Sequence, residues 1–466
     1  MHLQRIQVPD FRVLKDVDIT FEKEFVPRIF PLGSLNGGGK STLLQLIFVL
    51  LHCSTDDSDR TIFLKNMLNG FKIYENADKR VIAIVDVWDG EKSVTVEYFA
   101  YKNSYIRNLL NQVSDEADDE ISDEVSDEAD DEVSDEADDN YLYFSVLEES
   151  QEIQQETVNK MLEVVDIKRD FDKSKQEELM QAQSELEELE DQCKIFEFHS
   201  EKIRQYLQSE NLIYICSYSL DEDENEVLLC KIDNVDINQA KSFLDELSQK
   251  VFLAAPATQV FLFLSKESRK LLFRDLSNDK SDKTNSYSSE LKTANSNLPG
   301  FFAYDFLSVE LLVEAFKAAG DRDFREAIET GEYGNNYKGL MNDLKAILSN
   351  KKINLNPDFS GVNFKLDRDG ANVELLPEDL SHGELKRLSI YMWIKYHSME
   401  NAIILMDEVE IAFHPDWQYQ IISDLKQWAP NNQYILATHS YELCQALTPS
   451  HVKELEPKLL KQEAKQ

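Results

Sequence analysis

Hydrophobic and polar residues follow patterns along this chain that predict both strands and helices. Arg80–Trp88 and Lys92–Tyr101 alternate or run apolar with many β-branched residues, which is typical of paired strands. Two shorter apolar runs, Ala402–Met406 and Tyr434–Ala437, predict buried strands. The apolar run that ends at Leu51 predicts a helix. The chain is therefore predicted to contain both strands and helices.

The C-terminal part of the chain carries further periodic segments. Helices are expected near Val309–Ala319 and Tyr337–Leu348, and a strand pair around Val362–Leu376. The preceding segment, Asn278–Asn297, is polar and poor in large apolar residues, which predicts a loop or linker.

A seven-residue repeat of apolar positions runs through Lys175–Leu207. About four heptads of this kind predict a helical arm or hairpin. An ordinary amphipathic helix packed on the body of the protein explains the same pattern, and the sequence leaves both interpretations open. The repeating positions are Leu179, Leu186, Cys193 and Leu207 in one row and Ala182, Leu189, Phe196 and Ile203 in the other.

Charge is distributed unevenly along the chain. The 466 residues carry a formal net charge of −39, which argues against non-specific coating of nucleic acid, because phosphate contacts need Lys and Arg. Val113–Asp139 is a near-repeat of Val-Ser-Asp-Glu-Ala-Asp-Asp-Glu with 16 acids and no basic residue. Self-repulsion and the lack of apolar surface predict that this repeat is unfolded. A solubilising loop and a polyanion that binds a basic partner both fit its composition.

Cysteine usage and hydropathy restrict the compartment. The five cysteines are scattered and lack the spacing of a metal knuckle, which predicts reduced thiols in a cytosol. No apolar run approaches the roughly 20 residues of a membrane span. The first residues lack the charged and then apolar pattern of a secretory signal. We therefore expect a cytoplasmic protein with no membrane partner.

The stretch SLNGGGKST, Ser34–Thr42, carries the strongest chemical signal. Its glycines allow backbone N–H groups to approach an anion, which the N-terminus of the following helix also attracts. Lys40 can reach the β and γ oxygens of a nucleotide, and the Ser41 hydroxyl can ligate Mg²⁺. A glycine-rich turn without a ligand is the structural alternative. The residues expected to contact nucleotide here are Asn36, Gly37, Gly38, Gly39, Lys40, Ser41 and Thr42.

Two carboxylates follow the predicted strand Ala402–Met406. A strand that ends in this way places Asp407 where it can hold Mg²⁺, and Glu408 where it can polarise an attacking water. A solvated acidic turn is the alternative.

The predicted strand Tyr434–Ala437 delivers His439 to its carboxyl end, the edge where ligands bind in parallel sheets. We interpret His439 as a γ-phosphate sensor rather than a structural histidine.

A third motif, Leu380–Glu384, reads LSHGE. Ser381 and Glu384 have the spacing of a capping box for the helix that follows, which alone would explain them. A serine and Gly383 at a helix N-terminus also make a good anion site. The motif is therefore compatible with a helix cap and with a phosphate contact.

Together, these motifs resemble the ABC-type ATPase head of the SMC, RecF and OLD proteins. Ser34–Thr42 looks like the Walker A motif, and Leu380–Glu384 looks like the signature motif. IILMDE, which ends at Glu408, resembles Walker B, and Ala437–Ser440 resembles the switch-histidine motif. Ile6–Glu22 is similar to the N-terminal strand pair of that class. The resemblance implies an α/β P-loop head with an antiparallel β region and a helical or coiled-coil insertion.

The resemblance also implies cofactors and subunit contacts. ATP and Mg²⁺ would bind within one subunit, with Lys40, Glu408 and His439 as the catalytic residues. Ser381 and Gly383 would reach the γ-phosphate held by a second subunit, so a homodimer or higher homo-oligomer is expected. The glutamine of the family's Gln-loop is not evident, and Gln259 is the candidate.

The domain boundaries and role follow from the same resemblance. Residues 1–110 and 299–466 are expected to form the two parts of the head, with the acidic repeat at 111–140 and a helical insertion and linker at 141–298. The sequence looks more like the ATPase subunits of anti-phage systems such as Septu, PARIS and the retrons than like transporter ATPases.

This implies a sensor or scaffold ATPase that controls a separate nuclease or toxin. A DNA-repair ATPase of the RecF type that clamps duplex DNA, and a scaffold that binds nucleotide with little turnover, are the alternatives.

Overall fold

The computed structural model describes most of the two chain segments that carry the motifs. The described residues are 1–55, 57–105, 157–161, 164, 180–186, 189, 203–221, 224–273, 287–304, 308–348, 351–356, 361–368 and 371–455. The acidic repeat Val113–Asp139 lies outside them, as does most of the heptad segment Lys175–Leu207.

By its internal contacts the chain divides into two units. One consists of Met1–Met67, Ala83–Thr95 and Lys241–Gln466, and the other of Leu68–Ile82 and Val96–Ala240. The motifs that predict nucleotide binding all belong to the first unit, which we call the head.

A parallel sheet with strand order β15-β3-β14-β13-β8-β9 forms the centre of the head. Parallel pairing joins β13 to β14 and β8, and β14 to β3. β13 and β14 are buried along their whole length, as expected for a parallel sheet, and confirm the two predicted buried strands. The bounds are β3 Ile29–Gly33, β8 Val251–Ala255, β9 Phe301–Ala303, β13 Ile403–Asp407, β14 Gln433–Ala437 and β15 Lys453–Glu454.

Helices pack on this sheet and on one another. α1, Lys40–Cys53, contacts β8, β13 and β14 and is buried almost throughout, so the predicted apolar helix is confirmed. α11, His382–Tyr396, contacts α9, α10 and α12. The other helices are α2 Ser58–Leu68, α6 Ile237–Ser248, α7 Lys266–Leu271, α8 Tyr287–Asn297, α9 Ser308–Thr330, α10 Asn336–Leu348, α12 Pro415–Trp428 and α13 Tyr441–Gln445.

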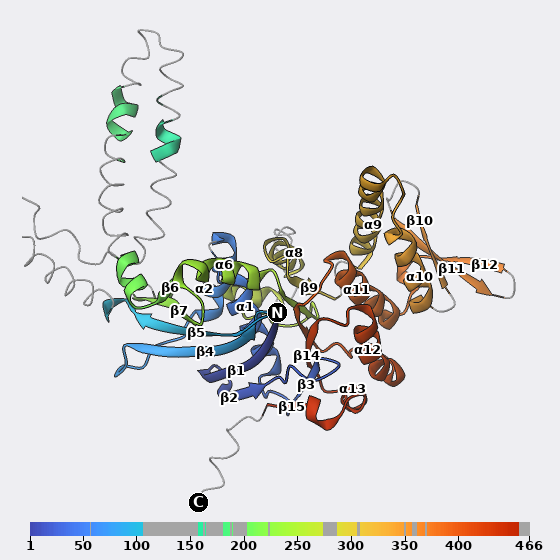
Figure 1. The fold of residues 1–466 in the computed structure, drawn as a ribbon, viewed down its shortest axis with the longest axis horizontal. Coiled ribbons are helices and arrows are strands. Elements are labelled where there is room, and N and C mark those ends of the chain that lie inside the picture. Colours follow the sequence, from blue (N-terminus) through green and yellow to red (C-terminus); the bar gives the residue numbers. More distant parts are fainter. Residues whose placement is uncertain are drawn as a thin grey trace, which may run out of the picture. The chain divides into compact units, whose positions relative to one another are not determined.

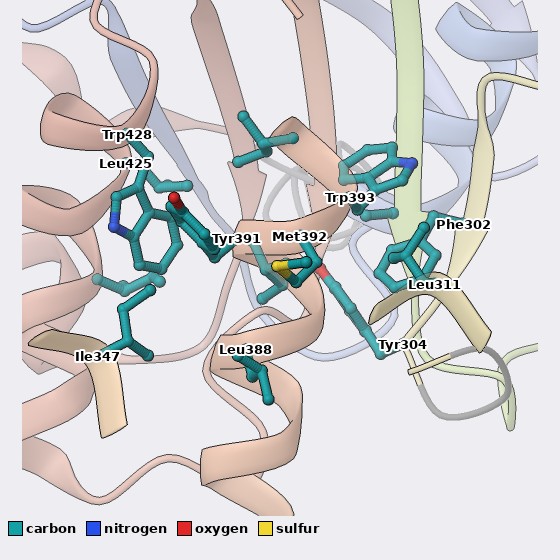
Figure 2. Close-up of a cluster of buried hydrophobic side chains, with 14 of the residues drawn as sticks. Phe302, Tyr304, Leu311, Ile347, Leu388, Tyr391, Met392, Trp393, Leu425 and Trp428 are labelled. Carbon is teal, nitrogen blue, oxygen red and sulfur yellow. The ribbon is translucent and has the colours of Figure 1, made fainter. Parts of the chain in front are cut away.

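Aromatic and aliphatic side chains together form the core around α11, as Figure 2 shows. Trp393 stacks on Phe302 of β9, with ring centroids 5.1 Å apart. Tyr391, two residues earlier, meets Trp428 of α12 edge to face at 5.3 Å. These contacts fix α11 between β9 and α12, and so fix the position of the motif at its start.

A small antiparallel sheet, β10-β11-β12, lies beside α9 and α10 (Figure 1). Its strands are β10 Lys351–Leu355, β11 Val362–Arg368 and β12 Ala371–Leu375. They confirm the predicted strand pair and add β10 to it. α9 and α10 confirm the predicted helices, although α9 continues to Thr330, well past the predicted end.

A second antiparallel region has strand order β2-β1-β4-β5-β7-β6. β1 pairs with β2 and with β4 in antiparallel register, which confirms the expected N-terminal strand pair. β4 and β5 confirm the two predicted alternating strands. The bounds are β1 His2–Phe11, β2 Leu14–Thr20, β4 Lys79–Trp88, β5 Ser93–Lys102, β6 Leu212–Asp221 and β7 Glu224–Asp233.

The expectation of a helical insertion and linker over 141–298 needs correction. β6, β7 and β8 lie within it, and β8 belongs to the parallel sheet of the head. The apolar and β-branched residues of Leu212–Asp221 favour a strand, a signal that the heptad pattern upstream obscured, whereas the short apolar run of β8 fits a strand or a helix. The predicted linker Asn278–Asn297 also contains a helix, α8, whose Leu291 and Ala294 are buried.

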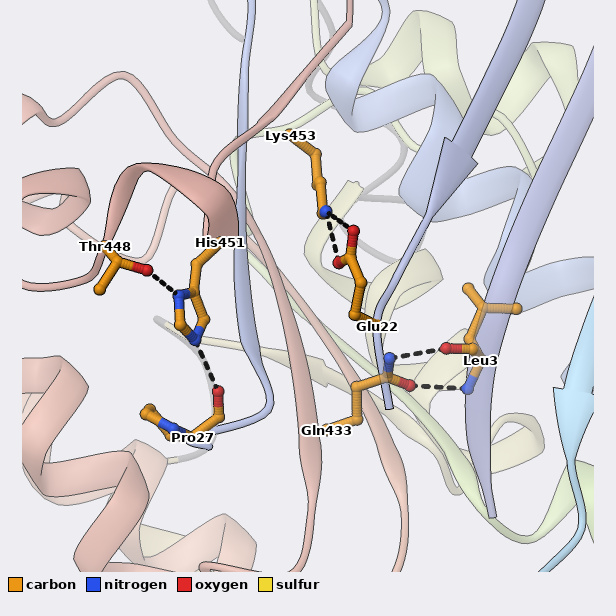
Figure 3. A network of polar contacts seen from close by, with 7 residues as sticks. All are labelled: Leu3, Glu22, Pro27, Gln433, Thr448, His451 and Lys453. Carbon is orange, nitrogen blue, oxygen red and sulfur yellow. Dashed lines mark hydrogen bonds and ion pairs between the residues drawn. The ribbon is translucent and has the colours of Figure 1, made fainter. Parts of the chain in front are cut away.

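Polar contacts connect β1 and the segment after β2 with the parallel sheet of the head (Figure 3). The Gln433 side chain accepts a hydrogen bond from Leu3 N at 2.7 Å and donates one to Leu3 O at 2.8 Å. Lys453 donates to both carboxylate oxygens of Glu22, at 2.6 and 2.8 Å. These bonds tie β1 to β14 and β15 to the segment after β2.

No helix among the described residues is long and apolar enough to cross a bilayer.

Candidate nucleotide-binding site

The loop between β3 and α1 has the backbone shape of a phosphate-binding loop. Gly37 and Gly39 adopt φ of 77° and 88°, in the left-handed region that favours glycine. A Cβ atom on Gly39 would lie 2.6 Å from Leu14 Cδ2, so a side chain there would require Leu14 to shift as well as a strained backbone. Within the described chain, no side chain caps the start of α1 at Gly39. The N–H groups at this helix start therefore remain available to an anion.

Lys40 is buried at the first position of α1, with a relative exposure of 7%. Its Nζ donates to Ser34 Oγ at 3.1 Å and to Ser34 O at 3.3 Å, and it lies 3.0 Å from His439 Nε2. Burial lowers the pKa of Lys40, and the charges of Asp407, Glu410 and Glu408 oppose that shift. The structure thus brings the loop lysine and the predicted sensor histidine into contact.

Asp407 ends β13 and is 1% exposed. Its Oδ2 accepts a hydrogen bond of 2.5 Å from Gln259 Nε2. Burial raises the pKa of Asp407 to about 6, against hydrogen bonds from Ser41 and Gln259 that lower it. The structure therefore brings Gln259, the Gln-loop candidate, to the carboxylate of Asp407.

Two side-chain oxygens beside Ser41 are suitable ligands for Mg²⁺. Asp407 Oδ1 and Gln259 Oε1 are buried and have no hydrogen-bond partner among the described residues. Carboxylate, amide and hydroxyl oxygens are the ligands that Mg²⁺ takes, together with water and substrate phosphates. The described residues contain no group of three or more His, Cys, Asp or Glu side chains that could hold a metal. A site with one carboxylate beside Ser41 and a nucleotide agrees with that finding.

Glu408 begins a tight turn after β13 with φ of 48°, a left-handed conformation that is uncommon outside glycine. Its N–H donates to Ala437 O at 2.9 Å, which links the ends of β13 and β14. Glu410, two residues later, is 8% exposed, and its Oε1 accepts a hydrogen bond of 2.7 Å from His439 N. The sequence interpretation missed Glu410. The third acid in DEVE was the available signal.

The other predicted residues lie at two helix starts. Asn36 is exposed at the tip of the loop, and Thr42 is half-buried in the first turn of α1. Ser381 is the N-cap of α11 and forms the capping box with Glu384: Glu384 N donates to Ser381 Oγ at 3.3 Å, and Ser381 N donates to Glu384 Oε2 at 3.0 Å. Gly383 is buried. The structure therefore confirms the capping box, which was the alternative to a phosphate contact at this motif.

Comparisons with known proteins bear on this site. The chain matches the AAA ATPase domain family over residues 1–444. It is 30% identical over 97 residues to the Retron Vc95 probable ATPase of Vibrio cholerae serotype O1 biovar El Tor, and 31% identical over 114 residues to the Retron Ec83 probable ATPase of Escherichia coli. These alignments cover 18% and 21% of this chain and the same shares of the relatives, so the chain spans about a fifth of the length of the relatives it matches.

Two solved structures are also similar to the chain. One is the Smc head domain with an extended coiled coil bound to the C-terminal domain of ScpA, derived from Pyrococcus furiosus, at 11% identity and a TM-score of 0.32 over 96% of this chain and 91% of that chain. The other is the SmcHead bound to the C-winged helix domain of ScpA, at 11% identity and a TM-score of 0.38 over 96% of this chain and 92% of that chain.

The similarity to the two retron ATPases confirms the predicted relationship to that group. The family match confirms the predicted ATPase, and it runs through the phosphate loop, Asp407, Glu408 and His439. Because it covers nearly the whole chain, the chain belongs to the AAA ATPase domain family.

Proposed function

We propose that the protein binds ATP with Mg²⁺ between its phosphate loop and the ends of β13 and β14, and hydrolyses it there. One observation carries this proposal: the Nζ of Lys40 lies 3.0 Å from His439 Nε2, in the field of Asp407, Glu408 and Glu410. A buried cation, a histidine and three acids at the carboxyl edge of a parallel sheet form an arrangement suited to phosphoryl transfer.

Each side chain has a distinct role in the proposed reaction. Lys40 binds the β and γ oxygens of ATP, which displace its present contacts with Ser34. Ser41, Asp407 and Gln259 would hold Mg²⁺, which would supply positive charge to the phosphates. Glu408 accepts a proton from the attacking water, and His439 donates to the γ-phosphate.

The second part of the proposal concerns assembly. Ser381 and Gly383 begin a helix, and a helix N-terminus attracts phosphate. We place this helix start against the γ-phosphate held by another copy of the chain, so that two heads close around two nucleotides. The capping box between Ser381 and Glu384 must loosen for Ser381 to donate to that phosphate, because its side chain now bonds Glu384.

The third part concerns biological role. The similarity to two retron ATPases supports a role in prokaryotic anti-phage defence. The protein would act there as a sensor or scaffold that controls a separate nuclease or toxin through ATP-dependent closure of two heads. The formal charge of −39 favours a protein effector over duplex DNA as the partner.

The test of the catalytic assignment is Glu408→Gln. The variant should bind ATP as the wild type does and hydrolyse it about 10²–10⁴-fold more slowly, the usual contribution of a positioned acid or base. Isothermal titration and phosphate release measure the two quantities. Wild-type turnover in Glu408→Gln would refute the role of Glu408.

Co-purification of the protein with the product of a neighbouring gene, with and without ATP, tests the effector.

A further inference from the structure

The turn that follows Asp407 has an unusual backbone. Glu408 and Ala412 adopt φ of 48° and 71°, although neither is glycine. Conformations of this kind are unfavourable for residues other than glycine and persist only where the surroundings impose them. Two hydrogen bonds close the turn, from Ile411 N to Glu408 O at 3.2 Å and from Phe413 N to Glu410 O at 3.0 Å.

Lys386 of α11 contacts this turn through two hydrogen bonds. Its side chain is buried, at 6% exposure, and its Nζ donates to Glu408 O at 2.9 Å and to Ile411 O at 3.2 Å. The ammonium also lies 4.1 Å from the centroid of the Tyr304 ring. A buried ammonium that donates to two carbonyls of one turn holds both of them in a fixed place.

The start of α11 touches the same turn. A Cβ atom on Gly383 would lie 2.7 Å from Ala412 O, so the glycine permits close approach of the two backbones. Gly383 and Lys386 are three residues apart and therefore lie on one face of the helix. The predicted signature motif and Lys386 thus reach the Glu408–Phe413 turn from the same side.

The same turn also contacts the residues that follow β14. Glu410 Oε1 accepts from His439 N at 2.7 Å. Gln418 Nε2 donates to Phe413 O at 2.9 Å, and Gln418 Oε1 accepts from Ser440 Oγ at 2.7 Å. The turn therefore lies in a continuous chain of contacts from α11 to the residues that follow β14.

From these contacts we infer that Lys386 is a positioning residue for hydrolysis, which acts by holding the backbone of Glu408 so that its carboxylate faces the water. The inference rests on the proposed function, which makes Glu408 the base. The first turn of α11 is proposed to meet the nucleotide of the other subunit. The inference adds that a displacement of α11 moves Glu408 of the subunit to which α11 belongs. Each head would then hydrolyse ATP only when α11 is correctly seated.

Replacement of Lys386 tests this inference in the full-length chain. Lys386→Met should lower kcat about 10–100-fold, because one misplaced catalytic group can cost up to about 10²-fold. Its KM and its affinity for ATP should stay within about twofold of wild type. Lys386→Arg, which keeps the charge and the donors, should recover part of the loss.

Lys395→Met is the matched control. Lys395 lies on the same helix, and its Nζ also donates to a backbone carbonyl, Trp428 O, at 2.8 Å, but away from the turn. Its loss should leave kcat within about twofold. If Lys386→Met fails to fold, Lys386→Arg alone carries the test, with a loss of kcat and an unchanged affinity for ATP.

The double variant Glu408→Gln/Lys386→Met separates two failures. If Lys386 acts through Glu408, the double variant should be no slower than Glu408→Gln alone, since the group that Lys386 positions is already lost. Multiplication of the two losses, or an unchanged kcat in Lys386→Met, would overturn the inference while the proposed function stands. Wild-type turnover in Glu408→Gln would instead overturn the proposed function, and the inference with it.

Discussion

The two helix starts proposed to bind phosphate, at α1 and α11, differ in how their backbone N–H groups are satisfied. In the part of the chain that the structure describes, no side chain caps α1 at Gly39. α11 begins with a closed capping box, in which Ser381 and Glu384 bond to each other's N–H groups. The first helix start is ready for an anion, whereas the second already holds its own carboxylate.

The charges at the two starts differ in the same direction. α1 begins with a buried cation, Lys40. α11 carries Glu384 in its first turn, and Lys351 of β10 forms an ion pair with that carboxylate. Burial alone would raise the pKa of Glu384, but the bonds from Lys351 and Ser381 outweigh it and lower the pKa. Under the proposed function, the start of α1 would bind nucleotide as it stands, whereas the start of α11 would first have to open its capping box.

The largest effect is expected at the start of α1. Lys40→Ala should weaken ATP binding by about 10²-fold or more, because hydrogen bonds to charged groups contribute about 1.5–3 kcal/mol each. Titration with ATP and Mg²⁺ measures it, and Lys292→Ala, at an exposed lysine of α8, is the control. Wild-type affinity in Lys40→Ala would show that α1 is not the nucleotide site and would remove the contrast.

The acid beside α1 gives the second prediction. Asp407→Asn should stabilise the nucleotide- and metal-free protein by about 2–3 kcal/mol at pH 8, since each unit by which burial raises a pKa corresponds to about 1.4 kcal/mol. A carboxylate whose pKa rises on folding to about 6 destabilises the folded state fully above pH 6, and the effect fades as the pH falls towards the unfolded value. Urea unfolding at pH 8 and pH 5 measures the difference.

Two controls accompany Asp407→Asn. The exposed Asp245→Asn should change the free energy of unfolding little at either pH. Glu384→Gln, at the other helix start, should destabilise the protein slightly, because that carboxylate is paired with Lys351. The same sign for Asp407→Asn and Glu384→Gln would contradict the comparison.

The third prediction asks whether the two helix starts meet across subunits. Lys40→Ala and Ser381→Arg chains should each be inactive alone, and a mixture should regain part of the ATPase activity, because a heterodimer can assemble one intact composite site. Phosphate release before and after mixing measures the recovery. If the subunits demonstrably exchange and no activity returns, Ser381 is only a helix cap.

The smallest effect concerns the capping box itself. Ser381→Ala should lower the free energy of unfolding by about 1 kcal/mol, the usual value of an N-cap serine. Ser265→Ala removes a comparable cap from α7, where Ser265 accepts from Ser268 N at 3.0 Å, and should have a similar effect on stability. Only Ser381→Ala should also lower ATPase activity. Equal ATPase activity in Ser381→Ala and Ser265→Ala would mean that Ser381 only caps α11 and does not contact nucleotide.

The sequence by itself determined the parts of the head whose signals are local. A glycine-rich loop followed by an apolar helix predicts β3–α1, and apolar runs that end in acids or in His439 predict β13 and β14. Each of these strands is a short apolar run that can be recognised without its neighbours. Local patterns are therefore sufficient to assign the motifs at Lys40, Asp407 and His439 to one sheet edge.

Only the tertiary structure decided the contacts that these motifs share. The third acid of DEVE, Glu410, and the helix residue Lys386 are both visible in the sequence, but no local pattern indicates which atoms they contact. Their partners, His439 N and Glu408 O, are backbone atoms 29 and 22 residues away. β8 was missed because five apolar residues fit a strand or a helix equally well until the neighbouring strand β13 pairs with them. Long-range pairing supplies the information that a local pattern lacks.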